Sequence, residues 1–111
     1  MIRRKYLDYL ESGKKKDRIK ILRKILEILE NKLQNKNISH QVRQDFLKNY
    51  GATYKEIISV YTEENQVVKC IEICKEVLDK NLVIPLFLEE IGFTKSFIYH
   101  TLSRLYRELG N

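Results

Sequence analysis

Residues 19 to 33 carry the pattern that most restricts how this chain folds. One apolar row follows a spacing of three and four residues, which places its members on one face of an α-helix. Its members are Ile19, Leu22, Leu26, Leu29 and Leu33. A second row beside it consists of Ile21, Ile25 and Ile28. A helix with two apolar rows has to bury both, so the sequence predicts a helix that packs on more than one side.

The row from Ile19 to Leu33 admits two interpretations. Both rows can face the core of a single chain, as one wide buried surface. Alternatively, the row can form a dimerisation seam with a second copy of the chain, because its spacing spans the few heptads that a short coiled coil requires. Both interpretations stay open at this point, and we expect a homodimer if the second is right.

The rest of the chain also has the composition of helices joined by short connections. Its 111 residues are 43% hydrophobic and include one Pro and four Gly. The predicted helices lie at about residues 3–12, within 14–37, and at 39–51, 53–61, 66–80, 85–91 and 94–109. Ser39 and Thr94 are the expected N-caps, and Gly51 is an expected helix stop. The predicted fold is all-α, a multi-helix bundle in one compact domain over residues 1–111, without wing strands.

Several classes of function are disfavoured by what the sequence lacks. It has no apolar run near the roughly 18 residues that span a bilayer, and its N-terminus has no signal-peptide core, so we expect a cytosolic protein. We expect Cys70 and Cys74 to be reduced and buried, since they lack the spacing of a zinc site. No phosphate loop, activated nucleophile or catalytic carboxylate pair is recognisable. We therefore predict a protein that is not an enzyme and holds no metal or cofactor.

The positive charge of the chain is concentrated near its N-terminus. The formal net charge is +6, and residues 1–36 hold 12 Lys and Arg against 5 Asp and Glu. The remaining residues hold 9 against 10. Such a cluster is either a solvated face or a set of phosphate contacts. The candidate phosphate-binding residues are Lys14, Lys15, Lys16 and Arg18.

The C-terminal stretch LEEIGFTKSFIYHTLSRL has the organisation of a helix-turn-helix. Phe87 and Ile91 would anchor the first short helix, Gly92 would form the turn, and Phe93 and Ile98 would lock the second helix in place. The outward positions of that second helix suit phosphates and base edges. These candidate DNA-binding residues are Thr94, Lys95, Ser96, Tyr99, His100 and Arg104.

The stretch EEIGFTKSFIYHTL resembles the DNA-binding helix-turn-helix of TetR-type repressors. It is also similar to small transposon-encoded helix-turn-helix accessory proteins, in which Ser-Phe-Leu-Tyr stands where this chain has residues 96–99. The resemblance covers about 40 residues when the preceding helix VVKCIEICKEVLDKN, residues 67–81, is included. It implies that Thr94, Lys95, Tyr99 and His100 contact phosphates or bases.

Residues 44–61 align with residues 85–102 in five apolar, Gly and Thr positions, including Gly51 with Gly92. This alignment suggests two tandem three-helix units, with possible sub-units at 14–62 and 66–111. Five matches in a Leu-rich helical chain also arise by chance. Both interpretations stay open.

These observations predict a sequence-specific protein that binds double-stranded DNA, either a transcriptional regulator or an accessory factor of a mobile element or plasmid. The alternative is a small helical regulator or inhibitor that binds a host protein complex. A third possibility is RNA, with Tyr54, Phe97 and Tyr99 stacking on unpaired bases.

Overall fold

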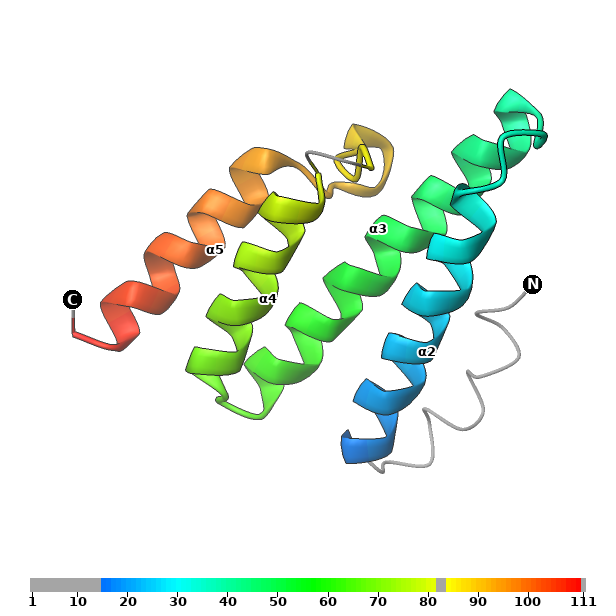
Figure 1. Cartoon of the computed structure of the whole chain (residues 1–111). Helices are drawn as coiled ribbons and strands as arrows, with labels where there is room; N and C mark the ends of the chain where they lie inside the picture. The colour runs from blue at the N-terminus through cyan, green and yellow to red at the C-terminus, as the bar shows by residue number, and fades with distance from the viewer. Residues whose placement is uncertain (1–14, 82–83, 111) are drawn as a thin grey trace.

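The described residues, 15–81 and 84–110 of a computed structural model, form four α-helices and one turn of 3-10 helix (Figure 1). They are α2 (Lys15–Leu33), α3 (His40–Glu63), α4 (Val67–Lys80), η1 (Glu89–Ile91) and α5 (Lys95–Glu108). The all-α prediction is confirmed. The predicted helix at 3–12 and the candidate Lys14 lie outside the described residues. No described helix is long and apolar enough to cross a membrane.

The four helices run antiparallel to their chain neighbours and lie in chain order across the molecule (Figure 1). α3 packs on α2, α4 packs on α3, and α5 packs on α4. The molecule is accordingly flat, with extents of 47 × 33 × 20 Å. Because α5 is the last helix in this row, one of its long faces has no helix of the described residues against it.

The apolar row of α2 lies inside the chain's own core. Leu22, Leu26, Leu29 and Leu33 are each at most 5% exposed, and Ile19 packs against the same cluster while half-buried. Ile25 of the second row is fully buried as well. The interpretation as a wide core-facing helix is therefore correct. The dimerisation seam predicted for this row is wrong, because its side chains are already covered by the same chain.

The helix stop predicted at Gly51 is also wrong. α3 continues without interruption from His40 to Glu63, and Ser39 caps its start by accepting a hydrogen bond from Val42 N at 3.2 Å. Gly51 serves a different purpose, since a Cβ there would lie 3.1 Å from the Leu86 carbonyl oxygen and from Ile91 Cδ1. The backbone of α3 thus needs a glycine where the segment before α5 crosses it closely.

A short α-helix was expected at 85–91, and only its end is helical. Residues 84–88 are not helical, and η1 provides a single 3-10 turn. Two backbone hydrogen bonds pair Leu88 with Phe93, and the amide of Leu86 donates to Asn81 Oδ1 at 2.8 Å. These bonds use the backbone groups that a helix would otherwise need. Of the predicted helix-turn-helix, the turn and the second helix are present, and the first helix is reduced to η1.

Gly92 makes the turn in the way the sequence predicts. Its φ of 69° is left-handed, and its amide donates to Glu89 O at 3.0 Å. Gly51 and Gly92, which the alignment of the two halves equates, therefore have different conformations, one inside a helix and one in a left-handed turn. α4 and α5 begin and end within a residue or two of their predicted bounds.

Candidate nucleic-acid interface

Helix α5 is held by a cap at its start and by one buried face. Thr94 is in extended conformation, and its Oγ1 accepts a hydrogen bond from Phe97 N at 3.1 Å. Ile98, Leu102 and Leu105 are buried against the rest of the molecule. Thr101 is buried with them, and its hydroxyl donates to Phe97 O at 2.7 Å. This arrangement fixes which side chains of α5 point outward.

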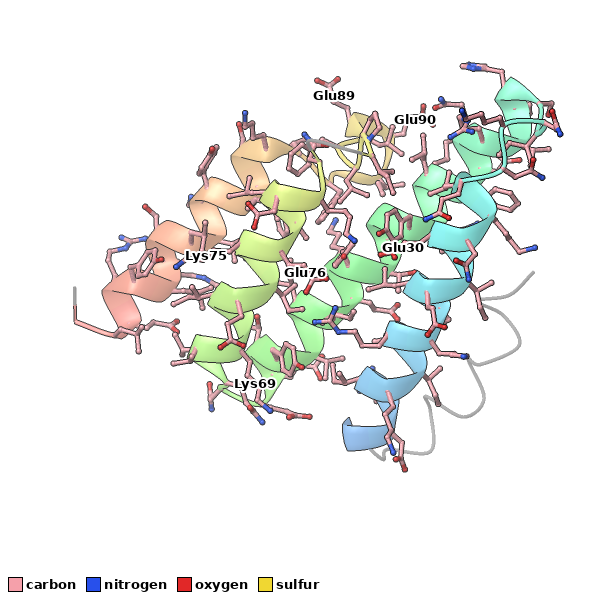
Figure 2. All side chains as sticks on the ribbon, in the orientation of Figure 1. Glu30, Lys69, Lys75, Glu76, Glu89 and Glu90 are labelled. Carbon is pink, nitrogen blue, oxygen red and sulfur yellow. The ribbon has the colours of Figure 1, made fainter. Side chains whose placement is uncertain are left out.

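The outward side chains of α5 form one continuous exposed surface, which we call the α5 face. It consists of Lys95, Ser96, Tyr99, His100, Ser103, Arg104 and Arg107. Tyr99 is 53% exposed. Three of the seven residues are cationic, and the first carboxylate of the helix is Glu108 at its last position. Lys75 of α4 points toward α5 and adds a further cation beside this surface (Figure 2).

Five of the six predicted DNA-binding residues lie exposed on this surface. They are Lys95, Ser96, Tyr99, His100 and Arg104. Thr94 is half-buried, and its side-chain oxygen is engaged in the helix cap. Arg107 was not among the predicted DNA-binding residues, although its position one turn after Arg104 follows from helical spacing.

Arg18, the candidate phosphate contact whose side chain is described, does not join the α5 face. α2 and α5 lie at opposite ends of the described helical row (Figure 1). Arg18 is half-buried, and its Nη1 lies 3.9 Å from Glu63 Oε2. Lys15 and Lys16 lie in the first turn of α2, and their side chains are outside the described residues.

Two carboxylates stand near the start of α5 on η1, as Figure 2 shows for Glu89 and Glu90. Glu90 is paired, since Lys48 Nζ of α3 lies 2.7 Å from its Oε2. That hydrogen bond raises the pKa of Lys48. Glu89 is exposed and is the carboxylate of this pair that weakens the attraction of the region for phosphate.

A polar network that sequence analysis missed joins α2, α3 and α4. Tyr54 Oη of α3 donates to Glu76 Oε2 of α4 at 2.6 Å, and Arg23 Nη1 of α2 donates to the same oxygen at 2.8 Å. Tyr50 Oη donates to Glu30 of α2, whose Oε1 also lies 3.1 Å from Lys80 Nζ. Figure 2 shows Glu30 and Glu76 in the space between these helices. The sequence signal that could have indicated this network is the spacing of Tyr50 and Tyr54, which places both hydroxyls on one face of α3.

The ionisation of this network follows from its burial and its pairing. Burial raises the pKa values of Tyr50 and Tyr54, and their hydrogen bonds to carboxylates raise them further. Burial also opposes ionisation of Glu76, but the hydrogen bonds from Arg23 and Tyr54 outweigh it and lower the pKa of Glu76. Both tyrosines are completely buried, so Tyr54 is not available to stack on an RNA base.

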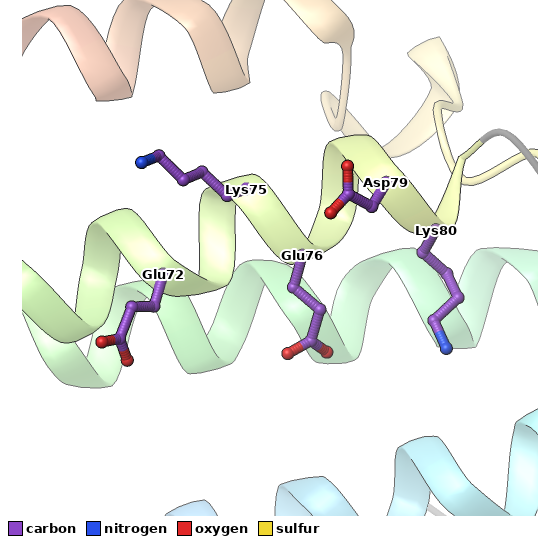
Figure 3. A pocket seen from close by; sticks show the side chains of 5 residues that line it. All are labelled: Glu72, Lys75, Glu76, Asp79 and Lys80. Atoms are coloured by element: carbon purple, nitrogen blue, oxygen red, sulfur yellow. The ribbon is translucent and has the colours of Figure 1, made fainter.

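An open pocket of about 540 Å³ lies along α4 (Figure 3). Its lining side chains are Glu72, Lys75, Glu76, Asp79 and Lys80. Glu76 and Lys80 are already bound to Arg23 and Glu30, and the remaining charges are of both signs. A surface of this kind selects no single class of ligand, so we assign it no site.

Both cysteines are free and buried, as predicted. The thiol of Cys70 donates to Ile58 O at 3.7 Å, and its sulfur lies 3.6 Å from Thr62 Oγ1. Among the described residues, no three His, Cys, Asp or Glu side chains gather in a way that could hold a metal ion.

Comparison of the chain with models of known protein families, with curated proteins and with solved structures found no match.

Proposed function

We propose that this protein binds double-stranded DNA with the α5 face, as a transcriptional regulator or as an accessory factor of a mobile element or plasmid. The observation that carries the proposal is the composition of that face. Lys95, Arg104 and Arg107 are exposed together with hydroxyl, phenol and imidazole groups, and no carboxylate interrupts them before Glu108. Cations supply phosphate attraction, and the uncharged polar groups suit base edges.

The shape of the molecule supports the same proposal. α5 has 14 residues and is therefore about 21 Å long. A helix of that length can lie in a major groove about 12 Å wide. It lies at the opposite end of the helical row from α2, so duplex DNA can approach the α5 face without meeting α2 (Figure 1). α5 begins shortly after the turn at Gly92, and the side chains of Lys95 and Ser96 in its first turn are exposed to solvent.

The test is fluorescence anisotropy with a labelled random-sequence duplex over a series of salt concentrations. We expect Lys95→Gln and Arg104→Gln each to weaken binding by about three- to tenfold near 0.1 M salt. Each should also reduce the slope of log K against log salt by about 0.9, the value for one lost phosphate contact.

Lys36→Gln is the matched control for this experiment. It removes the same charge from an exposed residue in the connection between α2 and α3, which lies away from α5 (Figure 1). It should leave the slope unchanged. Absence of binding at low salt, or an equal loss in all three variants, would contradict DNA recognition by the α5 face.

A second candidate function is the binding of a protein partner, and one apolar patch favours it. Val68 near the start of α4 is 57% exposed, and Leu109 after the end of α5 is 46% exposed. Both line an open hollow of about 620 Å³. Val68→Ser should leave DNA affinity unchanged if the α5 face acts alone. A loss of DNA binding in Val68→Ser, with the fold intact by circular dichroism, would assign the patch to the DNA interface and not to a protein partner.

A further inference from the structure

A second hollow lies between α3 and α5, on a surface that the α5 face adjoins. Its volume is about 340 Å³. Lys55, Ile58 and Ser59 line it from α3, and Phe97, Thr101 and Arg104 line it from α5. The two helices are not neighbours in the chain, so the hollow exists only because α4 holds α5 beside α3.

Two cations face this hollow, and one of them is held in place. Lys55 Nζ donates to Ile91 O at 3.1 Å and lies 5.5 Å from the centre of the Phe97 ring. An ammonium has three donors, so two remain for a ligand. Arg104 makes no side-chain hydrogen bond or ion pair within the described part of the chain, so no described residue occupies the donors of its guanidinium.

The remaining walls of the hollow are largely apolar or already satisfied. Ile58 is 3% exposed, and Phe97 is half-buried. The hydroxyls of Thr62 and Thr101 donate to carbonyls of their own helices, whereas the Ser59 hydroxyl is exposed. Glu63 is the carboxylate of the lining; its side chain is 54% exposed and lies 3.9 Å from Arg18, so solvent and that cation reduce its repulsion of an anion.

We propose that this hollow binds a small organic anion that has an apolar, flat body. The acid group, a carboxylate or a phosphate ester, is held between Lys55 and Arg104, with Ser59 as a further donor. The body lies against Ile58 and the Phe97 ring. A volume of about 340 Å³ is at the small end of the range for ligand sites, which suits a single-ring compound.

Arg104 belongs both to this hollow and to the α5 face. An anion that engages the guanidinium in the hollow removes it from a duplex phosphate, so occupancy of the hollow weakens DNA binding. This part of the inference rests on the proposed function, whereas binding of the anion does not. The hollow thus acts as a regulatory site through one shared side chain.

The test is a two-dimensional amide NMR titration of the full chain with three probes. Phenyl phosphate carries both the ring and the acid group, phenol carries the ring alone, and inorganic phosphate carries the acid group alone. We expect phenyl phosphate to shift the amide signals of Ser59, Phe97 and Arg104 and to bind at least tenfold more tightly than either of the other probes. Equal affinity for inorganic phosphate, or shifts centred elsewhere, would overturn the proposal.

Arg104→Gln and Arg107→Gln form the matched pair of variants. Both remove one exposed Arg charge from α5, but only Arg104 lines the hollow. Arg104→Gln should weaken phenyl phosphate binding about tenfold or more, the effect of losing one charge-assisted hydrogen bond, and Arg107→Gln should leave it unchanged. An equal effect of both variants would mean that general positive charge attracts the probe, and would overturn the site.

The coupling to DNA is read separately, by repeating the anisotropy measurement with phenyl phosphate at saturation. Sodium chloride of equal ionic strength is the control. We expect a weaker DNA affinity with phenyl phosphate in the wild type and no such change in Arg104→Gln. Probe binding without any DNA binding would keep the site and refute the proposed function. Probe binding with unaltered DNA affinity would refute the competition through Arg104.

Discussion

Glu76 joins α2, α3 and α4 through hydrogen bonds to a single carboxylate oxygen. Its Oε2 accepts hydrogen bonds from Arg23 of α2 and from Tyr54 of α3, while Glu76 itself belongs to α4. Each contact joins a different pair of helices. Because Arg23 keeps a side-chain exposure of 44%, water and salt screen this pair, and its contribution is smaller than that of a fully buried pair.

We therefore expect Glu76→Gln to lower the free energy of unfolding by about 1 kcal/mol at pH 7. The pKa of Glu76 is lowered in the folded protein from the ordinary value of 4.5. A lowered pKa gives stability that is complete above the ordinary value and is lost as the pH falls through the folded value. The difference between wild type and variant should consequently shrink below about pH 4.5.

Urea unfolding at pH 7 and at pH 3, followed by circular dichroism, measures this difference. Glu72→Gln is the control, since Glu72 is an exposed residue one turn earlier on α4. A difference for Glu76→Gln that stays constant between the two pH values would contradict the assigned role of its charge.

At the scale of single elements, α3 shows how a packing requirement overrides a local signal. Glycine usually favours the end of a helix, and Thr53 shortly after it resembles a new start. Thr53 is buried inside α3, and its hydroxyl donates to Asn49 O at 2.6 Å, the carbonyl one turn earlier. Gly51 is buried where the segment of Leu86 to Phe93 crosses it. The helix continues through Gly51 and Thr53, and both residues are buried in the core.

Gly51→Ala tests this close approach. Alanine favours a helix by about 1 kcal/mol over glycine, so an unhindered substitution would stabilise the protein. The Cβ would instead lie 3.1 Å from the Leu86 carbonyl oxygen and 3.3 Å from Phe93 Cδ2, and the backbone oxygen has little freedom to move away. We expect a net loss of about 1 to 2 kcal/mol in the free energy of unfolding.

The comparison is with Asn31→Ala, measured by the same denaturant unfolding. Asn31 is exposed in α2, so alanine there gains helix propensity without meeting a neighbour. We expect a small stabilisation of a few tenths of a kcal/mol. Stabilisation by Gly51→Ala of similar size or larger would show that the segment before α5 does not press against α3.

At the scale of the whole molecule, the helices form a flat row in which the four leucines of the α2 apolar row are buried by their own chain. Leu26 is 3% exposed, and Lys32 and Phe46 add a cation–π contact between α2 and α3, with Nζ 5.7 Å from the ring centre. Leu22, Leu26, Leu29 and Leu33 therefore have almost no exposed surface with which to contact a second copy of the chain. A homodimer would have to use another surface.

Leu26→Ala should therefore lower the free energy of unfolding by about 2 to 5 kcal/mol, the cost of a buried cavity. The unfolding midpoint of both proteins should not depend on protein concentration, because the row is covered within one chain. Val42→Ala is the control, since Val42 is 39% exposed and should lose well under 1 kcal/mol. A midpoint that rises with concentration in the wild type alone would restore the intermolecular seam.

Much of the arrangement could be read from local patterns. The α2 rows, the Ser39 and Thr94 caps and the turn at Gly92 are properties of short stretches, and the structure confirms each of them. Five of the six predicted DNA-binding residues are exposed for the same reason, since the buried row of α5 leaves only one face for them.

The sequence by itself thus determined the all-α class, the start of α5 and the outward face of that helix, because helical periodicity and capping act within a few residues. Only the tertiary structure decided that α3 runs through Gly51, that residues 84–88 are not helical, and that Glu76 meets Arg23 and Tyr54. The hollow between α3 and α5 was likewise decided only by the tertiary structure. Each depends on contacts between residues that are far apart in the chain, and no local pattern specifies which distant backbone or charge a residue will meet.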